Sequence, residues 1–325
     1  MALSYLVTGS AGFIGHHLSL RLLEQGHHVV GVDNLNDYYP VELKLARNEI
    51  LKKYPNYEFH HMDISDQVEI SKLIHGHDFE SIFHLAGQPG VRYSLENPHA
   101  YVKSNIIGSV NILEAVRHCK KRPYLFLASS SSVYGLSEVY PFREDHSFDR
   151  PVSFYGSTKG SMELMAHSYS HLYGIKCTAL RYFTVYGPWG RPDMAPFIFV
   201  NKILKGHEIE VFNNGDLVRD FTFISDIVDG TLNLNESRKD PNEPLWDVFN
   251  IGCSGPRPLG DFIKTIENTL GIKANIKMMP FQQGDVYKTY ADVNKLSNLC
   301  GYTPKVSLED GIFQFVKWYK DFYNA

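Results

Sequence analysis

The chain has 325 residues, of which 43% are hydrophobic and 21% are charged, and its formal net charge at pH 7 is −4. This composition is typical of a globular protein with one or two domains, and the slight negative charge argues against a nucleic-acid-binding protein, which would need a basic face. An apolar run of about eighteen residues, the length that predicts a membrane span, does not occur.

A glycine-rich turn is the first motif in the chain. A short apolar run at residues 4–8 is followed by three regularly spaced glycines, namely Gly9, Gly12 and Gly15. An amphipathic helix then extends to residue 25. The glycines permit a tight turn and bring the backbone close to a pyrophosphate, which the N-terminus of the helix attracts.

A second strand-like run at residues 29–32 ends at Asp33. A carboxylate at this position is placed to accept hydrogen bonds from an adenosine ribose. Because the same charge would repel a 2′-phosphate, we predict that the cofactor is NAD rather than NADP. The order of strand, glycine turn, helix and acid makes this prediction much stronger than the glycines alone.

The alternation of strands and helices continues through the first half of the chain. Further strand-like runs occupy residues 57–62, 81–85, 124–128 and 176–183, and a helical run occupies residues 100–119. This pattern predicts an α/β fold with a doubly wound parallel (Rossmann) sheet. Ligands bind such sheets at the carboxyl ends of the strands, so the loops there are candidates for the site.

Asn105 lies inside the helical run at residues 100–119, although asparagine is a poor helix former. Its side chain could simply be solvated. Alternatively, it satisfies backbone groups near the cofactor.

The second half of the chain is less regular. After residue 183 the sequence is rich in proline and glycine, and helical runs follow at residues 198–204, 259–270 and 308–322. We interpret this part as a smaller, substrate-binding lobe that is separated from the sheet by a cleft. The predicted organisation is a cofactor domain at residues 1–185 and, at residues 186–325, mainly the substrate lobe, with some segments returning to the first domain.

Tyr155 and Lys159 lie four residues apart at the start of a predicted helix that ends at Gly174. Side chains at this spacing share one helix face, so we expect the Lys159 ammonium near the phenol. A neighbouring cation lowers the pKa of a phenol from its ordinary value of about 10, which makes tyrosine useful for proton transfer. The spacing alone also fits two residues without a function.

The glycine motif, Asp33, Tyr155, Lys159 and the serine run in residues 129–135 (SSSSVYG) together resemble the extended short-chain dehydrogenase/reductase family. Within it, the chain is similar to the UDP-glucuronate 4-epimerases. The longest matching stretches are residues 33–39 (DNLNDYY), 90–98 (GVRYSLENP) and 181–195 (RYFTVYGPWGRPDMA). The resemblance covers nearly the whole chain.

This resemblance, together with the strand-end loops, gives the predicted contacts of the cofactor. Lys159 would hold the nicotinamide ribose and lower the pKa of the Tyr155 phenol. The full set of predicted NAD contacts is Gly9, Gly12, Phe13, Ile14, Gly15, Asp33, Asn34, Asn36, Asp63, Ile64, Leu85, Ala86, Gln88, Asn105, Tyr155 and Lys159.

The resemblance also implies contacts for the substrate. Tyr155 would be the catalytic base, assisted by Lys159, and Ser130 would hydrogen-bond the sugar 4-oxygen. Arg219 resembles the diphosphate-binding arginine of the family, a task that suits a bidentate guanidinium. The predicted substrate contacts are Arg92, Ser130, Ser131, Ser132, Tyr155, Thr184, Arg191, Arg219 and Asp285, with Thr184, Arg191 and the serines at the sugar carboxylate and Asp285 at the uridine ribose.

The chain departs from related enzymes at several positions. Gly156 replaces a helix-favouring alanine of many relatives, and Pro89 is unusual in the loop over the nicotinamide. Gln282 stands where galactose-type epimerases carry an arginine. Ser131 and Ser132 stand where the sugar dehydratases of the family carry an Asp-Glu pair, and UDP-xylose-forming decarboxylases carry a Glu at the position of Ser132.

The four cysteines, Cys119, Cys177, Cys253 and Cys300, form no C-x-x-C pair, and no secretory signal pattern precedes the first strand. These features predict reduced thiols in a cytoplasmic protein. The histidines show no spacing that predicts a metal site.

We therefore predict an NAD-dependent 4-epimerase that interconverts UDP-glucuronate and UDP-galacturonate through a 4-keto intermediate. The resemblance implies a homodimer that is built as a four-helix bundle. One open alternative is a 4-epimerase of UDP-galactose or a UDP-N-acetylhexosamine. Another is a non-catalytic dinucleotide-sensing module, which would be expected to have lost the tyrosine or the lysine.

Overall fold

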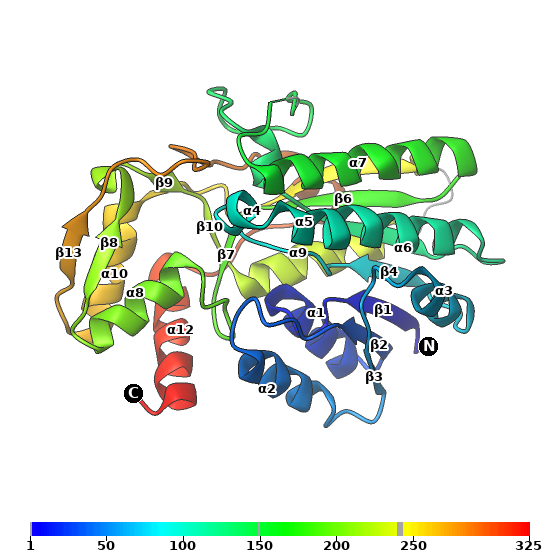
Figure 1. Cartoon of the computed structure of the whole chain (residues 1–325), viewed down its shortest axis with the longest axis horizontal. Helices are drawn as coiled ribbons and strands as arrows, with labels where there is room; N and C mark the ends of the chain where they lie inside the picture. The colour runs from blue at the N-terminus through cyan, green and yellow to red at the C-terminus, as the bar shows by residue number, and fades with distance from the viewer. Residues whose placement is uncertain (1, 149, 239–242) are drawn as a thin grey trace.

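The computed structural model describes residues 2–148, 150–238 and 243–325. Within them, seven strands form a central sheet in the order β11-β6-β5-β4-β1-β2-β3 (Figure 1). Their pairings are all parallel, which confirms the predicted doubly wound α/β fold. The strands are β1 (Ser4–Thr8), β2 (His28–Asp33), β3 (Tyr57–His61), β4 (Ser81–His84), β5 (Tyr124–Ser130), β6 (Cys177–Tyr182) and β11 (Trp246–Ile251).

Helices cover both faces of this sheet (Figure 1). Successive side chains of a strand point to opposite faces, so Tyr5 and Val7 belong to one apolar core and Leu6 to the other. The first core includes side chains of α1 (Phe13–Glu24), α2 (Val41–Leu51) and α9 (Ile224–Ser237). The second includes side chains of α3 (Gln67–His75), α6 (Gly108–Arg117) and α7 (Phe154–Tyr173).

A smaller lobe lies beside the sheet, at the left of Figure 1. The helical runs predicted at residues 198–204, 259–270 and 308–322 are confirmed, and they form α8, α10 and α12 of this lobe. Its elements are α8 (Ala195–Leu204), β8 (Glu208–Val211), η3 (Phe212–Gly215), β9 (Val218–Arg219), β12 (Arg257–Pro258), α10 (Leu259–Leu270), β13 (Asn275–Met278) and α12 (Leu308–Tyr323). Between lobe and sheet, β7 (Thr184–Tyr186) pairs with β10 (Phe221–Phe223), while α11 (Asn294–Cys300) packs on α9.

Strand β11 is an element that the sequence did not predict. It comes from the second half of the chain, yet it pairs with β6 at the edge of the main sheet. The first three residues of β11 are only partly buried, and Asp247 and Asn250 interrupt its apolar pattern. Such a short, mixed pattern is not distinctive of a strand until its neighbour is known.

The helical run predicted at residues 100–119 is divided into α5 (Pro98–Tyr101), the π-helical turn η1 (Val102–Ile107) and α6, and the short helix α4 (Tyr93–Glu96) precedes it. Asn105 lies in the π-helical turn and is buried. Single π-helical turns occur often at functional sites.

A buried ion pair joins α7 to the strands beneath it. The guanidinium of Arg181 on β6 donates to both carboxylate oxygens of Glu163 on α7, at 3.0 and 2.7 Å, and both side chains are 1% exposed. Ser129 at the end of β5 also donates to Glu163. Arg181 donates in addition to the hydroxyl of Tyr134, which in turn donates to Asn250 on β11.

The described residues contain no helix that is both long and apolar enough to cross a membrane. The four cysteines are free thiols.

We predict that Glu163→Gln destabilises the protein by about 3–5 kcal/mol, because it leaves the buried charge of Arg181 without its partner. Urea unfolding at pH 7 measures the change. The matched control is Glu49→Gln, which breaks an exposed pair with Lys52 and should cost less than about 1 kcal/mol. Equal losses in the two variants would contradict a special role of the buried pair.

Candidate active site

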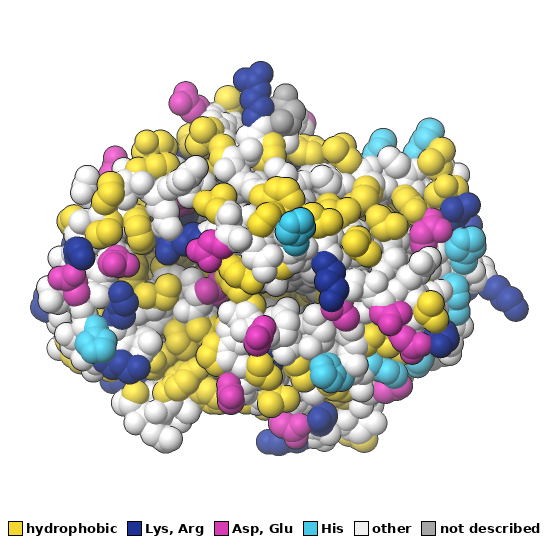
Figure 2. All heavy atoms as spheres, in the orientation of Figure 1, with side chains coloured by type: hydrophobic (Ala, Val, Ile, Leu, Met, Phe, Trp, Pro, Cys, Tyr) yellow, Lys and Arg dark blue, Asp and Glu magenta, His cyan; other side chains and the backbone are white. Residues whose placement is uncertain are grey.

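A cleft of about 730 Å³ opens at the carboxyl ends of the strands, between the sheet and the smaller lobe. Figure 2 shows it as a hollow left of centre with basic side chains inside. Its volume suits a cofactor or substrate site. Of the predicted site residues, all but Asp63 and Asn105 line this cleft.

The glycine loop fits a dinucleotide by its shape. Gly9 has a φ of +74°, and a Cβ atom there would lie 2.8 Å from the backbone nitrogen of Ala86. A Cβ atom on Gly15 would lie 2.1 Å from the carbonyl oxygen of Gly9. Helix α1 has Gly12 as its N-cap, without a side-chain capping bond, so the N–H groups of its first turn remain available to an anion such as a pyrophosphate.

Asp33 ends β2 beside this loop. Its carboxylate accepts hydrogen bonds from the N–H groups of Ala11 at 3.1 Å and Leu35 at 2.8 Å. Burial raises the pKa of Asp33, and these bonds and the charge of Lys44 oppose the rise. Carboxylate oxygens accept more than one bond each, so Asp33 can still accept from a ribose.

Lys44 is a cleft-lining cation that the sequence analysis did not identify. Its ammonium donates to the backbone and side-chain oxygens of Asn36, at 2.6 and 2.7 Å. The lysine lies in α2, three residues before Arg47, and no motif in the sequence marks it as part of the site.

Asn105 does not line the cleft but holds one of its loops. Its side chain accepts from the N–H of Gln88 at 2.7 Å and donates to the carbonyl of Gln88 at 3.2 Å and to Thr158 at 3.0 Å. The interpretation that Asn105 satisfies backbone groups is confirmed, and the solvated alternative is wrong. The asparagine thus joins the loop after β4 to α7.

Asp63 is not among the residues that line the cleft, and its predicted contact with the cofactor stays a prediction. It forms an ion pair with Lys103 at 2.9 Å and accepts from the N–H of Ser65 at 2.9 Å. These hydrogen bonds lower the pKa of Asp63 to about 2, although burial opposes the shift. Its neighbour Ile64 does line the cleft.

Tyr155 and Lys159 lie in the first two turns of α7, which begins after the N-cap Ser153 and ends at Gly174. The Lys159 ammonium is 6.0 Å from the centre of the Tyr155 ring and donates to the carbonyl of Ala128 at 2.6 Å. The two side chains therefore share one face of the helix, as predicted.

The pKa of Tyr155 is nevertheless raised rather than lowered. Burial is the main cause of the raised pKa, and the hydroxyl of Ser130 and the charge of Arg191 oppose the rise. Lys159 is not among the groups that oppose the rise, and its ammonium donates to the carbonyl of Ala128. Burial also lowers the pKa of Lys159, from 10.5 to about 8.

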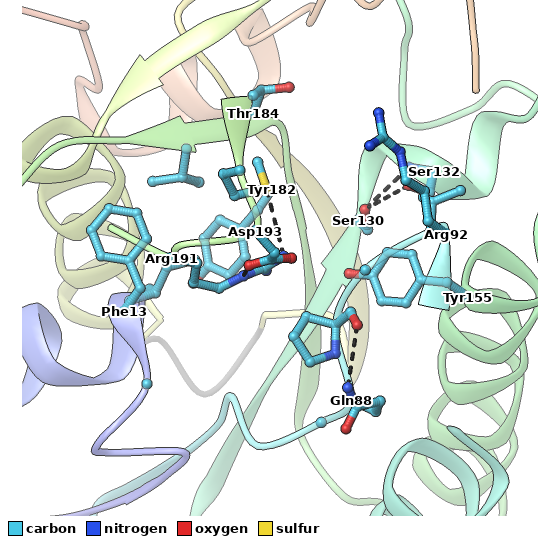
Figure 3. A pocket seen from close by; sticks show the side chains of 18 of the residues that line it. Phe13, Gln88, Arg92, Ser130, Ser132, Tyr155, Tyr182, Thr184, Arg191 and Asp193 are labelled. Carbon is cyan, nitrogen blue, oxygen red and sulfur yellow. Dashed lines mark hydrogen bonds and ion pairs between the residues drawn. The ribbon is translucent and has the colours of Figure 1, made fainter. Parts of the chain in front are cut away.

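The serine run continues β5 into the short helix η2 (Ser131–Tyr134). The Ser130 hydroxyl accepts from the N–H of Ser132 at 3.2 Å, which caps this helix. In Figure 3, Ser130, Ser132 and Tyr155 lie on one side of the cleft. Arg92 lies nearby, and its guanidinium is 4.6 Å from the centre of the Phe212 ring in the lobe.

Arg191 and Thr184 lie on the opposite side (Figure 3). The guanidinium of Arg191 forms two hydrogen bonds with the carboxylate of Asp193, at 2.9 and 2.7 Å. The sequence analysis did not select Asp193, although its position two residues after a predicted site arginine was a usable signal.

Arg219 and Asp285, the predicted diphosphate and ribose contacts, bind each other at 2.7 Å. Arg219 also donates to the backbone carbonyls of Val218 and Tyr287. Nearby, the side-chain oxygen of Gln282 is buried without a partner among the described residues.

Arg47 on α2 is a further residue that the sequence analysis missed. It is fully buried and donates to the carbonyl of Ala11 in the glycine loop at 3.0 Å and to the hydroxyl of Tyr39 at 2.8 Å. It also donates to the carbonyls of Trp189 at 2.6 Å and Gly190 at 3.4 Å. Arg47 therefore connects the glycine loop to the segment before Arg191.

Among the residues in the described ranges, no three His, Cys, Asp or Glu side chains form a group that could hold a metal ion.

Comparison with known proteins shows extensive similarity. Residues 6–315 match the family model of GDP-mannose 4,6 dehydratase. The chain is 43% identical to a probable UDP-glucuronate 4-epimerase of Rhizobium meliloti over 98% of both chains. It is also 43% identical to UDP-glucuronate 4-epimerase 3 of Arabidopsis thaliana, over 99% of this chain and 77% of that protein.

The structure is similar to the crystal structure of UDP-glucuronic acid 4-epimerase from Bacillus cereus in complex with UDP-glucuronic acid and NAD. The TM-score is 0.92, the sequence identity is 35%, and the match covers 99% of this chain and 100% of that one.

We predict that the protein binds NADP at least about tenfold more weakly than NAD, because the buried carboxylate of Asp33 repels a 2′-phosphate. Isothermal titration calorimetry with each dinucleotide measures the ratio. Asp33→Asn should reduce the ratio of the NADP and NAD dissociation constants. Asp63→Asn changes a carboxylate that does not line the cleft and should leave this ratio unchanged. Equal affinities of the unmutated protein would refute this role of Asp33.

A second prediction concerns the free energy of unfolding as a function of pH. The folded pKa of Lys159 is about 8 and its ordinary value is 10.5. Between these values the unfolded chain binds more protons, so the protein gains stability with rising pH. Between pH 7 and pH 10.5, the free energy of unfolding of the unmutated protein should rise by up to roughly 3 kcal/mol relative to that of Lys159→Met.

Urea unfolding of both proteins without added NAD, at several pH values in this window, measures the difference. Parallel pH profiles of the two proteins would mean that the burial of Lys159 carries no such cost.

Proposed function

The chain belongs to the extended short-chain dehydrogenase/reductase family of NAD-dependent epimerases and dehydratases, and from this premise we propose that it is a UDP-glucuronate 4-epimerase. It interconverts UDP-glucuronate and UDP-galacturonate. The observation that carries this conclusion is the arrangement of the cleft, where Tyr155 and the serine run face Arg191 (Figure 3). A proton-transfer group thus lies opposite a group that recognises carboxylates.

The glycine loop and Asp33 would hold NAD, which would supply a group that accepts a hydride from C4 of the sugar and gives it back. Tyr155 takes the proton of the 4-hydroxyl group, and Ser130 hydrogen-bonds the same oxygen. Because burial raises the pKa of Tyr155, we propose that its phenolate forms only when positive charge comes close to it. Lys159 is the lysine of α7, and with its pKa lowered to about 8 it is still mostly a cation at neutral pH.

Epimerisation requires the 4-keto sugar to present its other face before the hydride returns. Arg219 and Asp285 lie together in the lobe, and we propose that they hold the nucleotide while the sugar ring turns. Residues 186–325 would accordingly provide most of the UDP-sugar contacts, while residues 1–185 hold the cofactor. Thr184, Arg191 and the serine run would bind the sugar carboxylate.

The family model carries the name of a dehydratase, but Ser131 and Ser132 do not suit that chemistry. A dehydratase needs an acid to protonate a leaving hydroxyl group, and a serine hydroxyl is far too weak an acid near neutral pH. We propose that these serines hold the sugar carboxylate away from the geometry that favours loss of CO₂ from the keto intermediate.

The two alternatives predict different chemistry. A 4-epimerase of neutral UDP-sugars would not need a carboxylate-binding arginine opposite Tyr155. A non-catalytic dinucleotide sensor has no use for the Tyr155–Lys159 pair, yet both residues are present on one helix face.

We predict that the protein converts UDP-glucuronate to UDP-galacturonate with no net NADH and little UDP-pentose. The measurement is NMR of the products together with NADH absorbance and CO₂. Tyr155→Phe should bind NAD but lose about 10²–10⁴-fold in rate, because it lacks the acid-base group. Stoichiometric CO₂ with UDP-xylose, or turnover of UDP-galactose alone, would overturn the proposed function.

The protein's location and assembly are also proposed. The four free thiols support a reducing, cytoplasmic location. We further propose a homodimer that buries apolar side chains of α4, η1 and α7. These exposed residues are Leu95, Val102, Ile107, Phe154, Leu164 and Leu172. Figure 2 shows hydrophobic side chains gathered over these elements, and such a patch marks an interaction surface.

We predict that Leu164→Glu combined with Leu172→Glu converts the protein to a monomer, because two charges cannot be buried between facing helices. Light scattering after size exclusion at micromolar concentration gives the mass. The control, Phe313→Glu, changes an equally exposed residue on α12 and should leave the dimer intact. A monomeric unmutated protein would refute the homodimer.

A further inference from the structure

Arg191 and Asp193 form an ion pair that faces the cleft. Nε of Arg191 donates to Oδ1 of Asp193 at 2.9 Å, and Nη2 donates to Oδ2 at 2.7 Å. The side chains are 22% and 26% exposed, so the pair is largely buried. A guanidinium fork binds any carboxylate in this bidentate geometry, and here the carboxylate belongs to the protein itself.

Tyr38 holds Asp193 from the other side. Its hydroxyl donates to Oδ2 of Asp193 at 3.1 Å, and its ring packs on Tyr93 with 4.9 Å between the centres. A Cβ atom on Gly90 would lie 2.4 Å from this hydroxyl, so the glycine is what makes room for it. Asp193 is therefore fixed by contacts with two separate loops.

The ion pair has no net charge. Arg191 and its hydrogen bonds lower the pKa of Asp193, so Asp193 is ionised at neutral pH. Nη1 of Arg191 has no hydrogen-bond partner within the part of the chain that the structure describes. A substrate carboxylate can reach Arg191 through Nη1 or can take the fork from Asp193. In the first case two carboxylates share one guanidinium and repel each other, and in the second the substrate must displace Asp193 from the fork.

We propose that Asp193 is an internal carboxylate that competes with the carboxylate of the sugar for Arg191. The inference rests on the proposed function, because only a uronate substrate carries a carboxylate that can compete. It makes Asp193 a specificity-determining residue, one that weakens the binding of uronates without affecting neutral sugars.

The competition has a consequence for turnover. While the keto sugar turns, its carboxylate must release Arg191, and a buried arginine without a partner would be costly. Asp193 keeps the guanidinium paired at that moment. Without this internal carboxylate the uronate binds more tightly, but the keto sugar rotates more slowly. The added binding energy then does not help the reaction.

The test uses the protein saturated with NAD. In a Tyr155→Phe background, which separates binding from turnover, calorimetry measures the dissociation constants of UDP-glucuronate and UDP-glucose with and without Asp193→Asn. We expect Asp193→Asn to tighten UDP-glucuronate by about tenfold, as a charge-assisted hydrogen bond would, and UDP-glucose by less than about twofold. With Tyr155 restored, Asp193→Asn should lower both KM and kcat for UDP-glucuronate.

The matched control is Asp285→Asn, which makes the same change in the second Arg–Asp pair of the cleft. Because this pair is proposed to contact the nucleotide, which both sugars share, its substitution should change both affinities by the same factor. Arg191→Ala should weaken UDP-glucuronate selectively, because it removes the group for which both carboxylates compete.

Weaker UDP-glucuronate binding in Asp193→Asn would show that Asp193 only orients Arg191, and would overturn the proposal. Equal changes for both sugars would overturn it too. The proposed function is tested separately by the unmutated protein. If that protein does not epimerise UDP-glucuronate but the affinity ratio shifts as expected, the competition stands and the proposed function fails.

Discussion

The buried ion pair between Arg181 and Glu163 is the interaction on which the catalytic side of the cleft depends. It fixes α7, which carries Tyr155 and Lys159, against the sheet. Through Ser129 it also fixes the end of β5, where the serine run begins. A buried charge pair is costly to break, so the helix that carries the proposed proton-transfer groups is held firmly against the sheet.

A second buried arginine serves the other side of the cleft in a different way. Within residues 2–148, 150–238 and 243–325, Arg47 has no carboxylate partner, and it donates mainly to backbone carbonyls, on the glycine loop and on the segment that leads to Arg191. His17 adds a contact with the carbonyl of Pro188 at 2.9 Å. These contacts join the segment before Arg191, the proposed carboxylate site, to the glycine loop and to α1.

The features that could be predicted from the sequence are those with a local signature. The glycine loop, Asp33 and the Tyr155–Lys159 helix follow from spacing, and all of them line one cleft. Asn105 was marked by its poor fit to a helix, and the structure places it in a π-helical turn. Asp63 follows the end of β3, as Asp33 ends β2, but it forms an ion pair with Lys103 and is not among the residues that line the cleft.

The sequence by itself determined the parallel sheet, the glycine loop and the shared face of Tyr155 and Lys159 on α7. These features follow from periodicity and glycine spacing, which act over a few neighbouring residues. Only the tertiary structure decided the pairing of β11, the raised pKa of Tyr155 and the partner of Arg191. These depend on burial and on contacts between distant segments, such as that between Tyr38 and Asp193, which are 155 positions apart. Desolvation and such long-range hydrogen bonds are properties of the packed chain, and no local pattern specifies them.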